Sequence, residues 1–328
     1  MRTHPSSSPR HQNRHRTVAA AVLFLRLLLF LSIVGCSIER LAIRSLGDAL
    51  SGSGATFASD DDPELVKAAV PFSLKLIESL LAESPQHEGL LLAAASGFTQ
   101  YSFAFVEEDA DELAPKDLEG AEALRRRARR LYVRARRYGL RGLEVRHEGF
   151  EGAVRASPAT AVAQCVVEDV PLLYWTAAAW GRVIALSKNE PDAIADQGIV
   201  EALIDRALAL DESFGDGAIH TFLISYEMAR QGAQGDAAGR SRSHFDRAME
   251  LLGGQEAGPL VAFAEAVAIQ KQDPALFKSL LAQAVAIDVD ARPQSRLVNL
   301  VLQRRARWLL SRVDDLFVEP EPPLAGEK

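Results

Sequence analysis

The chain has 328 residues, of which 48% are hydrophobic and 25% are charged. A chain of this length and apolar content can bury a large core, which excludes disorder as its main state. Its two cysteines, Cys36 and Cys165, are too few for a disulfide framework or a cysteine-rich zinc site. Five of the 37 basic residues and none of the 44 acidic ones precede Cys36, so the chain from Cys36 onward carries a net charge of −12. This charge argues against nucleic acid as a partner.

The first 35 residues have the order of a secretory signal peptide. Residues 1–16 are polar and rich in Arg and His, and an apolar run follows at 17–34. The alternative of a retained membrane span is weaker, because the run is slightly short and contains Arg26. Cys36 follows Val34 and Gly35 and resembles the cysteine of a bacterial lipobox. We therefore predict a signal peptide at 1–35 and lipid attachment at Cys36, the alternative being a buried apolar cysteine.

The predicted mature chain is a lipoprotein anchored in a membrane, because several acyl chains together give stable anchoring. Ser37 rather than Asp follows the cysteine, which favours the outer membrane over the inner one. Residues 36–63 are predicted to form the lipidated N-terminus and a flexible tether, because Gly, Ser and Asp dominate from residue 51 on. Residues 318–328 are predicted to be a disordered tail.

The body at 64–317 lacks runs of alternating apolar and polar residues, so it is predicted to be all-α. Helix starts are indicated where a polar residue precedes Pro63, Pro158 or Pro274. The predicted helices are 64–83, 88–107, 117–138, 140–155, 159–168, 171–187, 192–210, 217–231, 240–252, 256–271, 274–287 and 294–317.

Helices of this length with short connections favour a tetratricopeptide-like array of helix pairs (an α-solenoid) with about four degenerate repeats plus extra helices. The alternative is an irregular helical bundle. Repeat endings are indicated near residues 80, 207, 245 and 284. The spacing of large, small and aromatic residues predicts which side chains are buried: Leu91, Ala95, Phe98, Leu173, Ala177, Trp180, Phe245 and Ala248.

No catalytic constellation, metal site or cofactor site is predicted. The histidines after Cys36 are dispersed (His87, His147, His220 and His244), and no glycine-rich phosphate loop occurs. Cys165 is interpreted as a buried small hydrophobic residue, and His220 as a hydrogen-bonded core or groove residue. An envelope hydrolase that uses Cys165 or His220 is the weaker alternative.

The segment 124–137 holds eight arginines. Apolar residues recur beside them at intervals of four and three, from Leu124 to Tyr138, which predicts one apolar stripe on a helix. The arginines then occupy the other faces, where the acidic stretch 107–112 offers ion pairs. The alternative is a docking surface for an anionic partner or lipid.

Aromatic residues concentrate in 98–105 and 174–180. The concave surface of a helix-pair array is formed mostly by the first helices of the pairs. The candidates for a groove that binds a ligand or partner are therefore Thr99, Gln100, Tyr174, His220 and Tyr226.

Three groups of residues carry a family resemblance. They are the lipobox with GDALSGSG at 47–54, the stretch PELVKAAVPFSLKLIESLLAESPQHEGLLLAAASGFTQYSFAFV from residue 63, and the later segments RARRLYVRARRYGLRGLE, DVPLLYWTAAAWGRVIALSKNEPD and ALALDESFGDGAIHTFLISYE. Together they resemble the T-component of tetratricopeptide-associated TRAP transporters over most of 36–287. Arg26 in the signal peptide departs from the pattern.

The resemblance implies a lipid-anchored protein that faces the periplasm and associates with the TRAP substrate-binding protein, the P-component. It also implies a homotrimer that helps present or pass a small organic ligand. The alternative function is an envelope scaffold that makes no contact with solute.

Overall fold

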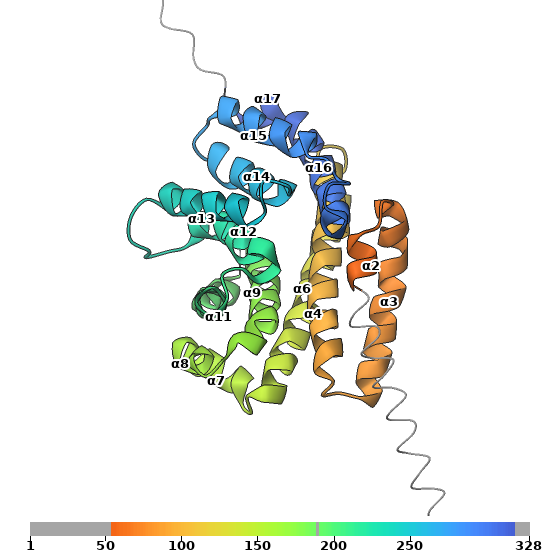
Figure 1. Ribbon diagram of the computed structural model, residues 1–328, viewed down its shortest axis with the longest axis vertical. Coiled ribbons are helices and arrows are strands. Elements are labelled where there is room, and N and C mark those ends of the chain that lie inside the picture. The colour runs from red at the N-terminus through yellow and green to blue at the C-terminus, as the bar shows by residue number, and fades with distance from the viewer. Residues whose placement is uncertain (1–53, 188–189, 319–328) are drawn as a thin grey trace, which may run out of the picture.

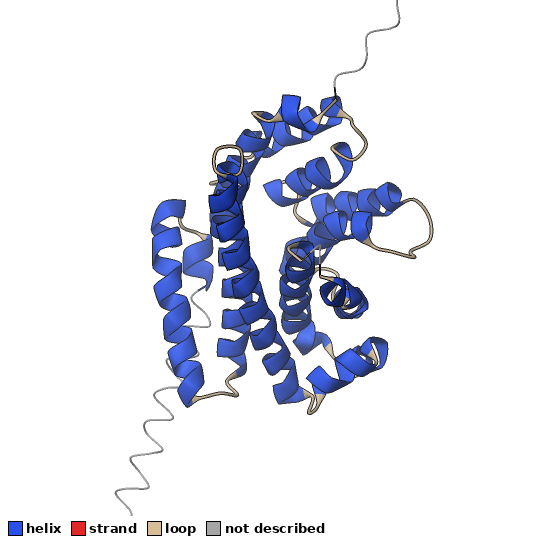
Figure 2. Ribbon diagram, turned by 180° about the vertical axis from the view of Figure 1, so that it is seen from behind, coloured by secondary structure: helices blue, strands red, loops and turns tan. Residues whose placement is uncertain are grey.

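The computed structural model describes residues 54–187 and 190–318. Every regular element in these ranges is a helix, as Figures 1 and 2 show. The elements are α2 (Gly54–Ala58), α3 (Pro63–Glu83), α4 (Glu88–Tyr101), η1 (Ser102–Glu107), α5 (Glu108–Leu113), α6 (Leu118–Arg146), α7 (Phe150–Ala156), α8 (Pro158–Ala163), η2 (Val167–Asp169), α9 (Val170–Ala185), α10 (Pro191–Ala195), α11 (Gln197–Leu210), α12 (Phe214–Ala229), α13 (Ala237–Leu251), α14 (Ala257–Phe263), η3 (Ala264–Ala268), α15 (Pro274–Ala286), η4 (Pro293–Ser295), α16 (Arg296–Leu310) and α17 (Val313–Leu316). The all-α prediction is confirmed.

The helices follow a curved path that returns to its start. The long helices α3, α4 and α6 lie side by side, and α9 packs on α4 and α6 (Figure 1). The chain continues through α11, then through α12 with α13 and α14 with α15. Finally α16 comes back to contact α2 and α3, so the C-terminal part of the fold meets the N-terminal helices.

The predicted core positions are buried. Six of the eight have no exposed surface, while Phe98 retains 3% and Phe245 retains 8%. Two triads, Leu91 to Phe98 on α4 and Leu173 to Trp180 on α9, each place a small residue between two large ones, and this lets neighbouring helices approach. The burial predicted from spacing is therefore confirmed.

The predicted helix starts are also borne out. The side chain of Asp62 accepts hydrogen bonds from the backbone N–H groups of Glu64 and Leu65, and Asp273 accepts one from Leu276. Pro63, Pro158 and Pro274 each occupy the first residue of their helix, where the missing N–H costs no internal bond. Ser157 differs from the two aspartates, because its hydroxyl donates to Thr160 Oγ1 at 2.9 Å rather than capping α8.

The predicted break between 138 and 140 is wrong, because α6 runs without interruption from Leu118 to Arg146. Gly139 and Gly142 sit where α9 crosses α6. A Cβ atom on Gly139 would lie 2.1 Å from Thr176 Oγ1, and one on Gly142 would lie 2.6 Å from a methyl of Leu172. These glycines therefore allow close helix packing and do not end the helix.

Other predicted boundaries shift for local reasons. The range 192–210 divides into α10 and α11, and 159–168 ends as an α-helix at Ala163 before a short 3₁₀ turn. The range 140–155 is shared between the end of α6 and α7, which follows Gly149 in the left-handed conformation. At the start of α12, Gly215, Asp216 and Gly217 all have positive φ, so the regular helix begins after them.

The N-terminal predictions fall largely outside the described residues. Cys36, the signal peptide and most of the tether at 36–63 lie there, as does the tail from 319 onward. The last part of the predicted tether is described, and it forms α2, which contacts α16.

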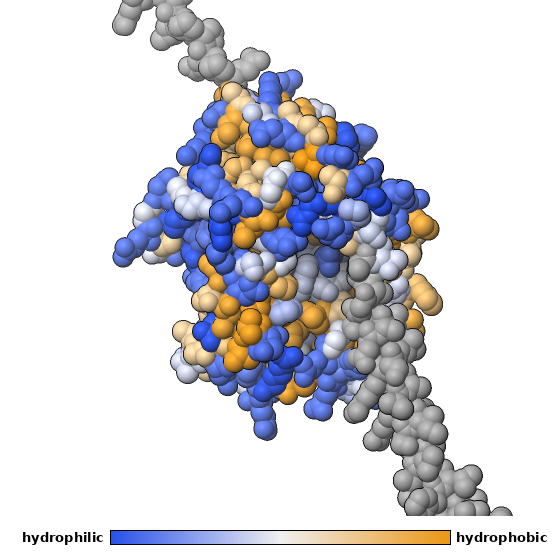
Figure 3. Space-filling model, in the orientation of Figure 1, coloured by the Kyte–Doolittle hydropathy of each residue, from blue (hydrophilic) through white to orange (hydrophobic). Residues whose placement is uncertain are grey.

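One helical stretch, Glu88–Leu113, is long and apolar enough by composition to cross a membrane. More than half of its apolar window, 56%, is buried inside the protein. It lies against α3, α6 and α9 as a central helix of the core. The outer edge over α3 is apolar in Figure 3, and Leu65 and Phe72 of α3 are 59% and 74% exposed.

Candidate functional site

An apolar cleft of about 240 Å³ lies between α3, the α4–η1 helix and α16, with α2 at one end. Its walls are formed by Phe57, Ala58, Val66, Val70, Ser73, Leu74, Ile77, Ala93, Ser96, Gly97, Gln100, Tyr101, Phe103, Ala104, Phe105, Leu297, Val298, Val301 and Leu302. Hollows with mainly apolar walls and a few polar groups are the usual sites for small organic ligands.

Small residues create the space on the α4 side. Ala93, Ser96, Gly97 and Ala104 face the cleft where larger side chains would fill it. At Gly97 the helices are already close, because a Cβ atom there would lie 2.8 Å from a methyl of Leu74. The cleft is thus a consequence of small residues along one side of a long helix.

The helix changes geometry at the cleft. The segment η1 is a π-helix, a wider turn that occurs often at functional sites. Phe103 and Ala104 of η1 line the cleft, and Phe103 is 38% exposed at its mouth together with Val298, which is 43% exposed. Gln100 supplies an amide to the wall, and its Nε2 donates to the Ser96 carbonyl at 3.4 Å.

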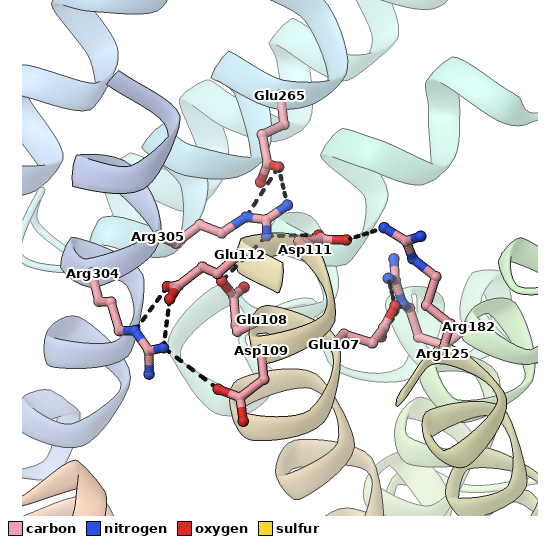
Figure 4. Close-up of polar contacts among 10 residues, drawn as sticks. All are labelled: Glu107, Glu108, Asp109, Asp111, Glu112, Arg125, Arg182, Glu265, Arg304 and Arg305. Carbon is pink, nitrogen blue, oxygen red and sulfur yellow. Dashed lines mark hydrogen bonds and ion pairs between the residues drawn. The ribbon is translucent and has the colours of Figure 1, made fainter. Parts of the chain in front are cut away.

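The same π-helical segment carries a buried carboxylate on its other side. Glu107 accepts hydrogen bonds from the Tyr132 hydroxyl and from Arg182, whose Nε lies 3.1 Å from Oε2. Figure 4 shows the contact between Glu107 and Arg182. Tyr132 is fully buried, and burial together with Glu107 holds the pKa of its hydroxyl well above the ordinary value. Glu107 thereby joins η1 to both α6 and α9.

Two arginines of α16 bind the acidic residues that follow η1 (Figure 4). Arg305 donates to Glu108 at 3.2 Å, to Asp111 at 2.8 Å and to Glu265 of η3 at 2.6 Å. Arg304 binds Glu112 at 2.7 Å. Burial raises the pKa of Glu108 to about 8, although Arg305 acts in the opposite direction.

The arginine-rich helix is ion-paired, as predicted. Arg125 of α6 lies 3.0 Å from Asp111, and Arg134 lies 3.5 Å from Glu78. The acidic stretch 107–112, however, is held mainly by Arg304, Arg305 and Arg182, which lie outside the arginine-rich segment.

The five predicted groove residues lie in different parts of the fold. Gln100 lines the apolar cleft, whereas Thr99 is buried and donates to the Ala95 carbonyl at 2.7 Å. Tyr174 packs on Phe214, with ring centroids 5.3 Å apart. Tyr226 stacks on Phe222 at 5.4 Å, and His220 is buried beside His244.

The dispersed histidines meet partners in space, which their sequence spacing did not indicate. His220 Nδ1 lies 2.9 Å from His244 Nδ1, and Nε2 of His220 lies 3.3 Å from Glu212. Burial lowers the pKa of both histidines, and the nearby His220 ring adds to the shift of His244. The packing of α12 on α13 brings the two rings together.

Cys165, His147 and Asp169 also converge, with their potential ligand atoms within 4.8 Å of one another. The carboxylate of Asp169 is already occupied, since it accepts from Arg146 at 3.2 Å, from the Val166 N–H at 2.9 Å and contacts His147 at 2.8 Å. Burial raises the pKa of the Cys165 thiol to about 11, and Asp169 adds to the shift. The thiol is therefore protonated at neutral pH and unsuited to nucleophilic attack.

Comparison with known proteins agrees with the sequence resemblance. A family model described as TRAP transporter T-component matches residues 59–317. The chain is also similar to an uncharacterized protein of Treponema pallidum (strain Nichols), with 30% identity over 306 residues that cover 87% of this chain and 94% of that protein. The chain belongs to the family of TRAP transporter T-components, accessory proteins of TRAP transport systems with a periplasmic or membrane-associated location.

Proposed function

We propose that this protein is a lipid-anchored T-component that binds the TRAP substrate-binding protein and holds a small organic ligand in the apolar cleft while the ligand is presented or passed on. The observation that carries the proposal is the cleft itself, which has apolar walls, an amide at Gln100 and a mouth at Phe103. In this proposal the chain acts by binding and not by catalysis.

Anchoring is proposed at Cys36, on the periplasmic side and in the outer membrane. The support is the lipobox-like sequence before Cys36 and Ser37 after it. The described fold begins at Gly54, close in sequence to the anchor. A chain extends by about 3.3–3.6 Å per residue at most, so the intervening segment lets the cleft work near the membrane without being embedded in it.

The surface that binds the substrate-binding protein is proposed to be formed by a tetratricopeptide-like array of helix pairs. Its pairs would be α9 with α11, α12 with α13 and α14 with α15, each of which packs directly together. Arrays of this kind bind partners over extended concave surfaces. A homotrimer is proposed to use the outer face of α3, where Leu65 and Phe72 are exposed, because large exposed apolar side chains mark contact surfaces.

The cleft is tested by filling it. Ala104→Phe and Ala93→Phe add a ring inside the cleft, and Ala123→Phe adds the same ring at an exposed position of α6 as the matched control. The uncharged dye Nile red is the probe, because its fluorescence rises in apolar surroundings. We expect the cleft variants to lose dye binding and solute uptake and to retain the substrate-binding protein, while Ala123→Phe keeps dye binding and uptake.

The scaffold alternative predicts a different pattern. If correctly folded Ala104→Phe and Ala93→Phe support normal uptake, the cleft holds no ligand, and the chain acts only by joining proteins. Circular dichroism and thermal unfolding establish that each variant is folded before uptake is compared.

A further inference from the structure

Two arginines lie against the ring of one buried tryptophan. All three residues belong to helices that do not line the apolar cleft. The guanidinium carbon of Arg136, on α6, is 4.6 Å from the centroid of the Trp180 ring. That of Arg155, on α7, is 5.2 Å from the same centroid. Trp180 of α9 is fully buried and donates from Nε1 to Asp196 at 3.0 Å, so the ring is fixed in place.

Both guanidinium groups converge on the same carboxylate. Arg136 Nη1 lies 3.9 Å from one oxygen of Asp196, and Arg155 Nη1 lies 3.9 Å from the other. These separations are ion-pair contacts but too long for hydrogen bonds. Arg155 has one more acid nearby, Glu151 at 3.6 Å, which is 56% exposed.

Neither arginine makes a hydrogen bond to another described residue. The Nε atom of Arg136 is buried and has no hydrogen-bond partner among the described residues, and the Arg136 side chain is only 18% exposed. Other arginines of this protein at similar depth are bonded, as Arg230 is to Glu227 and to Asp205. A buried donor without a partner destabilises the folded protein, and a ligand that accepts a hydrogen bond from it removes that penalty.

The local charge favours an anion. Burial lowers the pKa of Arg136, and repulsion by Arg155 is the next largest cause, while Asp196 and Glu151 act in the opposite direction. Two guanidinium groups thus share Asp196 and a largely solvated Glu151. An added negative charge between them would relieve this repulsion.

We propose that Arg136 and Arg155, held against Trp180, form a binding site for one small oxyanion, a carboxylate or a phosphate group. The planar guanidinium fork matches the oxygen spacing of both groups and binds them through two parallel hydrogen bonds. Access is from the Arg155 side, because that side chain is 43% exposed. Trp180 and Asp196 position the two arginines and leave their remaining N–H groups for the ligand. The anion site does not use the cleft, so its test is independent of the proposed transport role.

The test is titration of the purified protein with inorganic phosphate and, separately, with acetate, at constant ionic strength set with chloride. Binding is followed by isothermal calorimetry and by tryptophan fluorescence, which Trp180 makes sensitive to this site. We expect saturable binding of one anion per chain. Arg136→Gln and Arg155→Gln should each weaken it by roughly tenfold or more, because a charge-assisted hydrogen-bond pair is lost.

The matched control is Arg242→Gln. Arg242 also stacks on an aromatic ring, Phe245 at 5.3 Å, and pairs with Asp246, but within 54–187 and 190–318 no second guanidinium group shares that carboxylate. This variant should bind the anion as the parent does. The tighter of the two probes identifies the group for which the site is built.

Two outcomes would overturn the proposal. One is that neither anion binds in a saturable way, and the other is that all three variants bind equally, which is the mark of a general salt effect. Arg155→Gln decides the matter if Arg136→Gln does not fold, because Arg155 is the more exposed of the two side chains.

Discussion

Arg305 of α16 donates to Asp111 of α5 at 2.8 Å, across 194 residues of sequence. The same guanidinium group reaches Glu265 of η3 at 2.6 Å and Glu108 at 3.2 Å. One side chain therefore joins α16 to η3 and to α5, the helix that follows η1. Because η1 forms a wall of the cleft and leads directly into α5, the network around Arg305 also fixes the geometry of the cleft.

Removal of Arg305 should destabilise the protein strongly. Its side chain is 13% exposed, and Arg305→Ala removes the cation that Glu108, Asp111 and Glu265 share. Breaking a buried ion pair from one side costs about 3–5 kcal/mol. Urea unfolding measures the change, with Arg242→Ala as the control, because that arginine is 55% exposed and its ion pair contributes less than about 1 kcal/mol. Equal losses for the two variants would contradict the role given to Arg305.

Glu108 should make stability fall as the pH rises. Its pKa is about 8 in the fold because of burial, against a reference of 4.5. Between these values the folded protein holds a proton that the unfolded chain has released, so the free energy of unfolding decreases with pH across this window. Glu108→Gln keeps a neutral side chain and should reduce that decrease, whereas the exposed Glu148→Gln should not. Unfolding curves measured between pH 5 and pH 8 provide the check. Each unit of pKa shift corresponds to about 1.4 kcal/mol of stability.

Gly139 should be intolerant of a side chain. A methyl group there would lie 2.1 Å from Thr176 Oγ1 and 3.1 Å from Thr176 Cβ, so α6 and α9 would have to separate. We expect Gly139→Ala to cost about 1–3 kcal/mol, as overpacking does. Gly152→Ala, in a helix with nothing within 4 Å of the added atom, should be neutral or stabilising by up to about 1 kcal/mol. Thermal unfolding of both variants separates helix propensity from close packing.

Cys36 should determine whether the protein associates with membranes. Cys36→Ala removes the proposed attachment point for lipid and is expected to release the chain from membranes into the soluble envelope fraction. Fractionation followed by immunoblotting measures this. If the variant still sediments with membranes after washing without detergent, the lipobox interpretation is wrong.

Local rules predicted much of the fold. The burial of Leu91, Ala95 and Phe98 follows from the spacing of large and small residues along a single helix, and the Asp62 cap follows from a polar residue before Pro63. The role of Gly139 could not be predicted in this way. Glycine after an arginine-rich stretch indicates a helix end unless the helix that packs on it is known.

The long-range contacts could not be predicted from the sequence, because they depend on how distant helices pack together. The acidic stretch was expected to find its cations on the nearby arginine-rich helix, but Arg305 reaches it because the chain curves back on itself. His220 and His244 meet for the same kind of reason, through the packing of α12 on α13. Of the predicted groove residues, Gln100 lines the cleft, whose opposite walls come from α3 and α16.

In the proposed function, this chain serves a TRAP system by direct binding of the TRAP substrate-binding protein. The most direct measurement is mild crosslinking in cells that carry the full-length chain, followed by purification and mass spectrometry of the partners. We expect the TRAP substrate-binding protein to be recovered with the parent chain and with the Ala104→Phe variant alike. Recovery of unrelated envelope proteins without that partner would contradict it.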